Sequence, residues 1–155
     1  MQTLDNAVAR QSHQKVLQPF ILIVDDNPTN LSVLSQTLKS ADYKVRMAVD
    51  GEDALAQIDR AHPELILLDV QMPKIDGFET CRRLQAAPTT RGIPIIFTTA
   101  LADRDNKLKG LELGAVDYVT KPFEPEEVLA RVKIHWRLVN WFQGLRTKSI
   151  TLSAA

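Results

Sequence analysis

The sequence alternates short apolar runs with longer amphipathic stretches, and this alternation restricts the fold more than any other feature. Short runs of aliphatic and β-branched residues predict strands, whereas apolar residues three or four positions apart predict helices. We expect strands near residues 20–24, 44–48, 65–68, 94–98 and 117–119. We expect helices near residues 28–40, 52–61, 77–87, 104–113 and 125–143. Strands that alternate with helices predict an α/β fold with helices on both faces of a parallel sheet.

Several helix ends have a local cause in the sequence. Asn27 can cap the first helix, whose first turn accepts Pro28, and Asp50 can cap the second. Asp76 is also interpreted as a cap or a turn residue. Gly114 suits the left-handed residue that closes the fourth helix. These assignments give consecutive strand–helix units without an internal repeat.

Charged and hydroxyl side chains stand where the predicted strands end. Asp25 and Asp26 follow the first strand, Asp69 the third, Thr99 the fourth and Lys121 the fifth. The carboxyl ends of parallel strands lie on one edge of a sheet, so these residues are expected to meet there. Clustered carboxylates repel one another unless a cation lies between them, and Mg2+ binds to a few carboxylates together with phosphate oxygens. The pattern therefore predicts a Mg2+ site that also binds a phosphoryl group.

The same cluster suggests a chemical role for one carboxylate. An aspartate can act as a nucleophile and form an aspartyl phosphate. Phosphoryl transfer requires positioning and charge neutralisation, which the cation, Lys121 and the Thr99 hydroxyl could supply. Asp69 is expected to be the phosphoacceptor, because the adjacent pair Asp25 and Asp26 is better suited to the metal.

The motifs at these strand ends resemble the receiver domain of bacterial two-component response regulators, over about residues 20–138. The motifs are Val24-Asp25-Asp26, Leu68-Asp69-Val70-Gln71-Met72-Pro73, Asp76-Gly77, Pro94-Ile95-Ile96-Phe97-Thr98-Thr99-Ala100, Gly114-Ala115 and Asp117-Tyr118-Val119-Thr120-Lys121-Pro122-Phe123. Each is weak alone, but their order along the chain is highly specific. The resemblance implies a flavodoxin-like, doubly wound (βα)5 three-layer sandwich, similar to the chemotaxis regulators, with sheet order 2-1-3-4-5.

The resemblance also implies a role for individual residues. Asp69 resembles the phosphoacceptor that takes the group from a partner histidine kinase, and Asp25 and Asp26 resemble the Mg2+ pair. The backbone carbonyl of Gln71 would be a further metal ligand. Thr99 resembles the switch hydroxyl, and Tyr118 resembles the aromatic residue that changes rotamer with it.

Further expectations come from the same resemblance. Lys121 resembles the lysine that pairs with the phosphate, and its bond to Pro122 is expected to be cis. Thr98 departs from the family, which more often has an apolar residue before the switch hydroxyl, and it could be confused with Thr99. The side chains of Gln71 and Leu101 stand where the family tunes hydrolysis. An apolar Leu101 could obstruct the attacking water, so a phosphorylated lifetime of minutes or longer is expected.

Composition and charge exclude some classes of function. Nineteen basic residues balance nineteen acidic ones, so no overall field attracts nucleic acid or an anionic membrane. No apolar run approaches the ~20 residues of a spanning helix, and residues 1–18 lack the apolar stretch of a secretory signal. A cytoplasmic protein is expected. The three histidines show no metal-ligand spacing and are expected at the surface or at helix ends.

The domain organisation is predicted as an N-terminal arm at 1–18, a receiver domain at 19–138, and a C-terminal helix extension and tail at 139–155. The last helix carries two apolar stripes. One stripe should pack on the sheet and consists of Val128, Leu129, Val132, Trp136 and Val139. The other begins a heptad seam and consists of Ile134, Leu138, Trp141 and Leu145. The second stripe either mediates homodimerisation or partner docking, or belongs to an irregular tail.

The preferred function is a receiver that is phosphorylated on Asp69 and switches the surface formed by helix 104–113, strand 117–119 and the last helix. It would be a switch with only self-phosphorylation and autodephosphorylation activity, or a module from a hybrid histidine kinase or a larger regulator. A phosphohydrolase with an aspartyl nucleophile is a remote alternative, because such enzymes use an Asp-x-Asp arrangement after the first strand. A nucleotide-binding protein is disfavoured, since no glycine-rich turn follows that strand.

Overall fold

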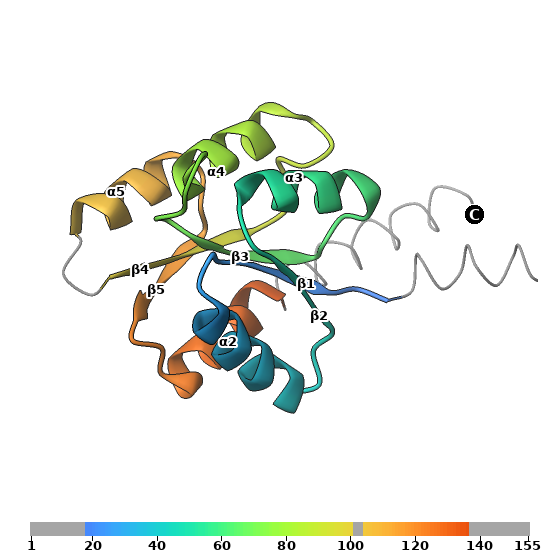
Figure 1. Ribbon diagram of the computed structural model, residues 1–155, viewed down its shortest axis with the longest axis vertical. Helices are drawn as coiled ribbons and strands as arrows, with labels where there is room; N and C mark the ends of the chain where they lie inside the picture. Colours follow the sequence, from blue (N-terminus) through green and yellow to red (C-terminus); the bar gives the residue numbers. More distant parts are fainter. Residues whose placement is uncertain (1–17, 101–103, 137–155) are drawn as a thin grey trace, which may run out of the picture.

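A five-stranded parallel sheet forms the centre of the molecule in this computed structural model, which describes residues 18–100 and 104–136 (Figure 1). Its order is β2-β1-β3-β4-β5. The strands are β1 (Ile21–Val24), β2 (Val45–Ala48), β3 (Leu65–Asp69), β4 (Ile95–Ala100) and β5 (Asp117–Lys121). All four neighbouring pairs are parallel. The predicted doubly wound fold and strand order are confirmed.

Helices cover both faces of the sheet and make a three-layer structure. They are α2 (Pro28–Ser40), α3 (Gly51–Arg60), α4 (Gly77–Ala86) and α5 (Arg104–Glu112), and residues 125–136 are helical as well. Figure 1 shows α3, α4 and α5 on one face, and α2 with the C-terminal helical segment, residues 125–136, on the other. We call these the α3–α5 face and the α2 face.

The helices α2 to α5 begin and end at, or within one residue of, the predicted positions. Asn27 accepts hydrogen bonds from two backbone amides in the first turn of α2, at 2.8 and 3.2 Å. Asp50 and Asp76 each accept one in the same way, at 2.7 and 2.8 Å, and cap α3 and α4. Gly114 has a φ of 107°, which a residue with a Cβ rarely adopts. Local chemistry therefore sets these boundaries, and α3 begins one residue earlier than expected, at Gly51.

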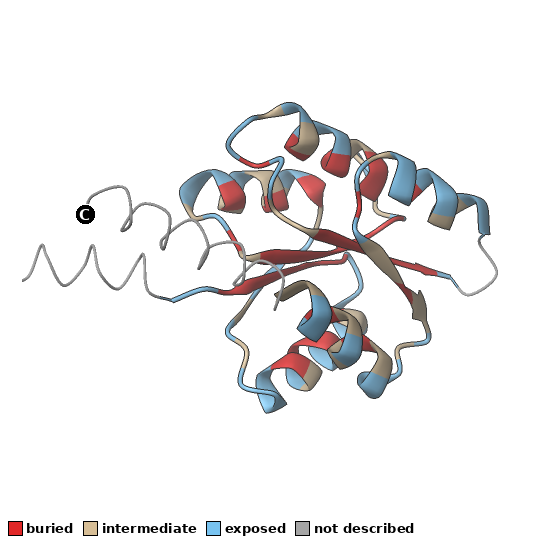
Figure 2. Ribbon diagram, turned by 180° about the vertical axis from the view of Figure 1, so that it is seen from behind, coloured by how far each residue is buried: buried red, intermediate tan, exposed pale blue. Residues whose placement is uncertain are grey.

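Alternating side chains of the central strands fill two cores, one against each layer of helices. β1 and β3 are buried along their whole length, as central parallel strands are (Figure 2). Leu22 and Leu68 pack on the α3–α5 face. Ile23, Leu67 and the leucines of α2 pack on the α2 face. Side-chain alternation along each strand thus decides to which face of the sheet its last side chain projects.

The C-terminal helical segment packs through one of its two predicted stripes. Val128 and Val132 are buried on the α2 face, and Leu129 and Trp136 pack beside them. Trp136 also meets Tyr43 edge to face, with ring centroids 5.2 Å apart. On the other stripe, Ile134 is 52% exposed, whereas Leu138, Trp141 and Leu145 lie outside the described residues.

His135 is more enclosed than a surface residue. Its side chain is 14% exposed, and Nε2 lies 3.0 Å from Oδ2 of Asp117 at the start of β5. Arg131 donates to both oxygens of the same carboxylate, at 3.2 and 3.3 Å. This polar cluster joins the C-terminal helical segment to β5.

Three expectations concern residues that the structure does not describe. The N-terminal arm (all but residue 18), Leu101 and the extension at 139–155 lie outside the described ranges. Within those ranges, no helix is both long and apolar enough to cross a membrane.

Candidate metal centre

The carboxyl ends of β1, β3 and β5 bring the predicted acids and the lysine together. Asp25, Asp26 and Asp69 each offer one carboxylate oxygen, and these three oxygens lie within 4.8 Å of one another. The ammonium nitrogen of Lys121 is 2.8 Å from Oδ1 of Asp69 and 3.6 Å from Oδ2 of Asp25. Residues that are far apart in the sequence therefore form one cluster at the predicted edge of the sheet.

Asp25 is held in place by the turn that follows β1. The backbone amide of Asn27 donates to its Oδ1 at 2.9 Å, and the side-chain amide of Asn30 donates to its Oδ2 at 3.2 Å. Asn27 therefore has two roles, because its backbone amide holds Asp25 and its side chain caps α2. Sequence reasoning did not identify Asn30, although its place in the first turn after the cap directs it back towards the strand end.

The electrostatics of Asp69 are those of a carboxyl group withdrawn from water. The residue is 3% exposed, and burial raises its pKa from 3.8 to about 6. The hydrogen bond from Lys121 lowers the pKa but does not offset burial, and the nearby charge of Asp25 raises it further. A hydrogen bond from the backbone amide of Gln71 lowers it slightly. The site therefore favours any cation that stabilises the charged form.

The donor set fits a hard divalent cation. All three side chains offer carboxylate oxygens, which Mg2+ prefers. Asp25 and Asp69 are buried, whereas Asp26 is exposed and leaves the cluster open to solvent. Two buried carboxylates with one ammonium between them retain excess negative charge, so the residues present fit a bound Mg2+.

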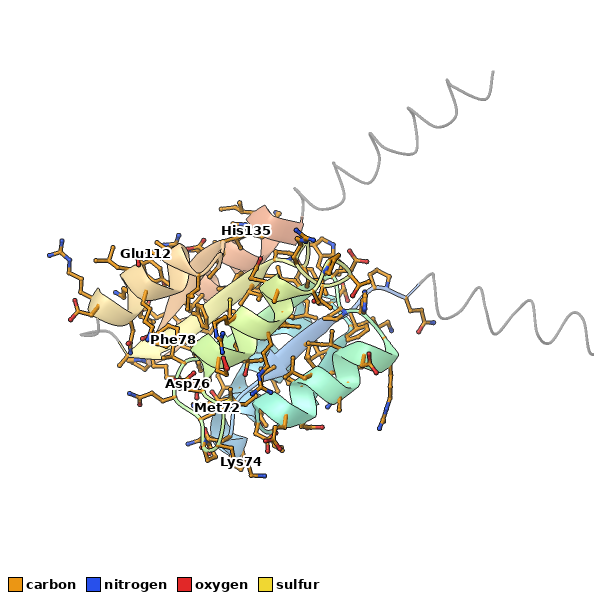
Figure 3. All side chains as sticks on the ribbon, turned by 90° about the horizontal axis from the view of Figure 1, so that it is seen from above. Met72, Lys74, Asp76, Phe78, Glu112 and His135 are labelled. Carbon is orange, nitrogen blue, oxygen red and sulfur yellow. The ribbon has the colours of Figure 1, made fainter. Side chains whose placement is uncertain are left out.

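A groove of about 430 Å3 adjoins the cluster on its solvent side. Asp26 and Gln71 line it next to the site, and the rest of its lining includes Met72, Asp76 and Phe78. Figure 3 shows the last three residues along the loop after β3 and at the start of α4. The groove therefore opens beside Asp26, on the exposed side of the cluster.

Close backbone packing fixes the loop that follows Asp69. The amide of Gly77 donates to the carbonyl of Val70 at 2.8 Å. A Cβ at Gly77 would collide with the backbone carbonyl of Asp69. The sequence offered Gly77 only as part of a motif, and its close approach to the Asp69 backbone depends on the tertiary structure.

Thr99 and Tyr118 lie on the other side of the sheet from Lys121. The register pairs Phe97 with Tyr118, and alternation puts Thr99 on the same α3–α5 face. Thr99 is buried and Tyr118 is half-buried. The ammonium nitrogen of Lys107 lies over the Tyr118 ring, 4.8 Å from its centroid. The predicted residues are therefore divided between a charged cluster and a hydroxyl–aromatic pair. The peptide bond between Lys121 and Pro122 is cis, as expected.

Comparisons with known proteins agree with this architecture. The family model described as "Response regulator receiver domain" matches residues 21–133. The DNA-binding dual master transcriptional regulator RpaA of Synechocystis sp. is 45% identical over 115 residues, which are 74% of this chain and 48% of that protein. The chain thus spans about half the length of this curated relative.

Solved structures give the same result. A putative response regulator from Chloroflexus aurantiacus is 42% identical, with a TM-score of 0.74 over 77% of this chain and 98% of that one. The receiver domain of DrrB, described as BeF3 activated, is 38% identical, with a TM-score of 0.69 over 78% of this chain and 99% of that one. From its matched family model, its relatives and its fold, the chain belongs to the receiver domains of two-component response regulators, which act in signal transduction.

Proposed function

We propose that Asp69 accepts a phosphoryl group from a histidine kinase or a phosphotransfer protein, in a reaction that depends on Mg2+. The observation that carries this proposal is the pairing of a buried Asp69 carboxylate with the Lys121 ammonium inside a three-carboxylate cluster. Such a carboxylate is poised as a nucleophile, and the surrounding charges are those that a phosphoryl group requires. The receiver family consists of regulatory switches, so no turnover of an external substrate is proposed beyond self-phosphorylation and autodephosphorylation.

The transfer itself needs only the groups at this sheet edge. A carboxylate oxygen of Asp69 forms a bond to phosphorus while the bond between phosphorus and the donor's imidazole nitrogen breaks, and the imidazole keeps the electron pair. Lys121 stays beside the reacting oxygens and neutralises part of their charge. Asp25, Asp26, Asp69 and the backbone carbonyl of Gln71 would hold Mg2+, which would supply further charge neutralisation when bound. Thr99 provides a hydroxyl donor from the end of β4.

Phosphorylation would change the surface made by α5, β5 and the C-terminal helical segment. Thr99 and Tyr118 share the face that α5 covers. Gly110 is the only buried residue of α5, whereas Leu108 and Leu111 on this helix are exposed. A helix held by so little buried surface can shift at low cost when Thr99 and Tyr118 rearrange. This surface is therefore the proposed output of the switch.

The output could control a partner or dimerisation. Ile134 is exposed on the second stripe of the C-terminal helical segment, and this observation supports a homodimer or a docked helix along that stripe. For the chain itself we propose protein partners, because its acidic and basic residues balance. A cytoplasmic location suits such partners.

The relatives also allow a larger context. RpaA is described as DNA-binding, and this chain corresponds to about half of it. A longer regulator or a hybrid kinase that contains this chain is the alternative setting. The phosphoacceptor chemistry of Asp69 would be the same in either setting.

Incubation with acetyl phosphate and Mg2+, followed by intact mass spectrometry, tests the proposal. The parent should gain one phosphoryl group and the Asp69→Asn variant none. Asp76→Asn is the matched control, because asparagine can keep the cap on α4 while the cluster stays intact. A gain that persists in Asp69→Asn, or a loss that also occurs in Asp76→Asn, would contradict the assignment.

A further inference from the structure

Thr98 has a buried hydroxyl without a hydrogen-bond partner among the residues that the structure describes. The residue is 1% exposed, and an unpaired buried hydroxyl is costly because it has given up its hydrogen bonds to water. Buried polar groups are nearly always paired, so this exception calls for a physical reason. An apolar side chain of the same shape would avoid the cost.

The register puts Thr98 beside the proposed phosphoacceptor. Thr98 is the partner of Asp69 on β3 and of Val119 on β5. Paired residues on parallel strands project to the same face, about 4.8 Å apart. That face is the α2 face, since Val119 and Ile96 pack there. Thr98 therefore flanks Asp69 on the side of Lys121, whereas Thr99 belongs to the opposite face.

In the unphosphorylated protein, the Asp69 carboxylate oxygen that would suit the Thr98 hydroxyl already accepts another hydrogen bond. Oδ1 of Asp69 accepts from the Lys121 ammonium at 2.8 Å. A phosphoryl group on Asp69 adds charged oxygens, which compete for that ammonium. The phosphorylated side chain then has more acceptor oxygens than the Lys121 ammonium alone can pair with. The Thr98 hydroxyl is an unpaired donor on the same α2 face. Rotation about χ1 moves a threonine hydroxyl between staggered positions within the space of the side chain.

We propose that the Thr98 hydroxyl is a second switch donor, which forms its hydrogen bond to an oxygen of the Asp69 side chain only when that side chain is phosphorylated. The inference rests on the proposed function. The hydroxyl is unsatisfied before phosphorylation and satisfied afterwards, so it shifts the equilibrium towards the phosphorylated arrangement. Thr98 acts as a positioning residue on the Lys121 side, and Thr99 acts on the Tyr118 side.

Two variants of Thr98 separate the hydroxyl from the rest of the side chain. Thr98→Val keeps the shape and removes the hydroxyl, and Thr98→Ser keeps the hydroxyl. Thermal unfolding without ligands reports the cost in the resting state. Calorimetric titration of beryllofluoride in the presence of Mg2+ reports the gain, because this anion mimics a phosphoryl group on an aspartate without a covalent reaction.

The proposal predicts opposite effects in the two measurements. Thr98→Val should unfold at a temperature equal to or above that of the parent, yet bind beryllofluoride about tenfold more weakly. Thr98→Ser should bind within about twofold of the parent. The proposal is overturned if Thr98→Val binds as tightly as the parent, if it is less stable without ligands, or if Thr98→Ser loses as much affinity. A parent that binds no beryllofluoride, or an Asp69→Asn variant that binds it equally well, would instead refute the proposed function and this inference with it.

Discussion

The ammonium nitrogen of Lys121 lies 2.8 Å from Oδ1 of Asp69, although the two residues are 52 positions apart in the sequence. Asp69 ends β3 and Lys121 ends β5, and β4 lies between these strands in the sheet. The lysine therefore reaches across the end of β4 to make the contact. Because the same ammonium lies 3.6 Å from Asp25, one cation joins three strand ends and offsets part of the repulsion between two buried carboxylates.

Asp69→Asn should make the metal-free protein more stable at neutral and alkaline pH. The pKa of Asp69 is raised from 3.8 to about 6, so its contribution to stability is complete below about pH 4 and is lost as the pH rises through about 6. Asparagine stays neutral and avoids this loss. The gain in the free energy of unfolding should be about 1–2 kcal/mol at pH 8, since solvent screens part of the effect, and should vanish near pH 4, as measured by urea unfolding.

Magnesium provides the control for that measurement. A cation bound by the carboxylates stabilises the folded parent by mass action, whereas the asparagine variant has lost one ligand. Addition of Mg2+ at pH 8 should therefore reduce the difference in the free energy of unfolding between the parent and Asp69→Asn. A variant that is less stable than the parent at pH 8 without metal would contradict the electrostatic account of this site.

Lys121→Met should slow phosphorylation while the protein stays folded. Methionine keeps much of the apolar stem but removes the charge that faces Asp69 and Asp25. The loss of one preorganised charge at a phosphoryl-transfer site costs roughly a hundredfold in rate. The measurement is the rate of mass gain with acetyl phosphate and Mg2+. Lys74→Met, in the loop after β3, is the matched control and should react at the parental rate, because Lys74 is exposed. Equal rates in the two variants would remove Lys121 from the chemistry.

Gly77→Ala should destabilise the protein through the backbone of the phosphoacceptor. The added methyl group would collide with the carbonyl of Asp69, so the loop after β3 must move. Overpacking of this kind typically costs ~1–3 kcal/mol, and the lower stability should be accompanied by slower phosphorylation. Gly92→Ala is the matched control, since no atom lies within 4 Å of its added Cβ. Comparable losses in both variants would argue against a specific role for Gly77.

Much of this structure could be predicted from local sequence, because local patterns set the strands, the caps and the strand-end acids. Asp69 and Lys121 were found in this way, since parallel strands must end on one edge of the sheet. Other features depend on distances between elements. The bond from Asn30 to Asp25 and the tight fit of Gly77 exist only once α2 and α4 are packed on the sheet. The sequence could not assign faces to the neighbouring threonines either, because the faces follow from the register of β4.

Asp117→Asn should weaken the attachment of the C-terminal helical segment to β5. The carboxylate accepts two bonds from Arg131 and lies 3.0 Å from His135, and asparagine can replace only part of these interactions. The cost should be about 1–2 kcal/mol in the free energy of unfolding. Asp59→Asn, an exposed aspartate near the end of α3, should change stability by less than about 0.5 kcal/mol. A loss at Asp117 no larger than at Asp59 would show that the polar cluster adds little.

Ile134→Glu should lower the association of the protein if the second stripe of the last helix forms a dimer. Ile134 is 52% exposed on the side of the C-terminal helical segment that does not pack on the sheet, and a heptad seam requires apolar residues at such positions. Light scattering of the parent over a range of concentrations should show dimers, and Ile134→Glu and a truncation after Leu138 should both shift the mass towards the monomer. Val33→Glu changes an exposed apolar residue on α2 and should leave the mass unchanged. A monomeric parent, or an equal shift with Val33→Glu, would rule out dimerisation through this stripe.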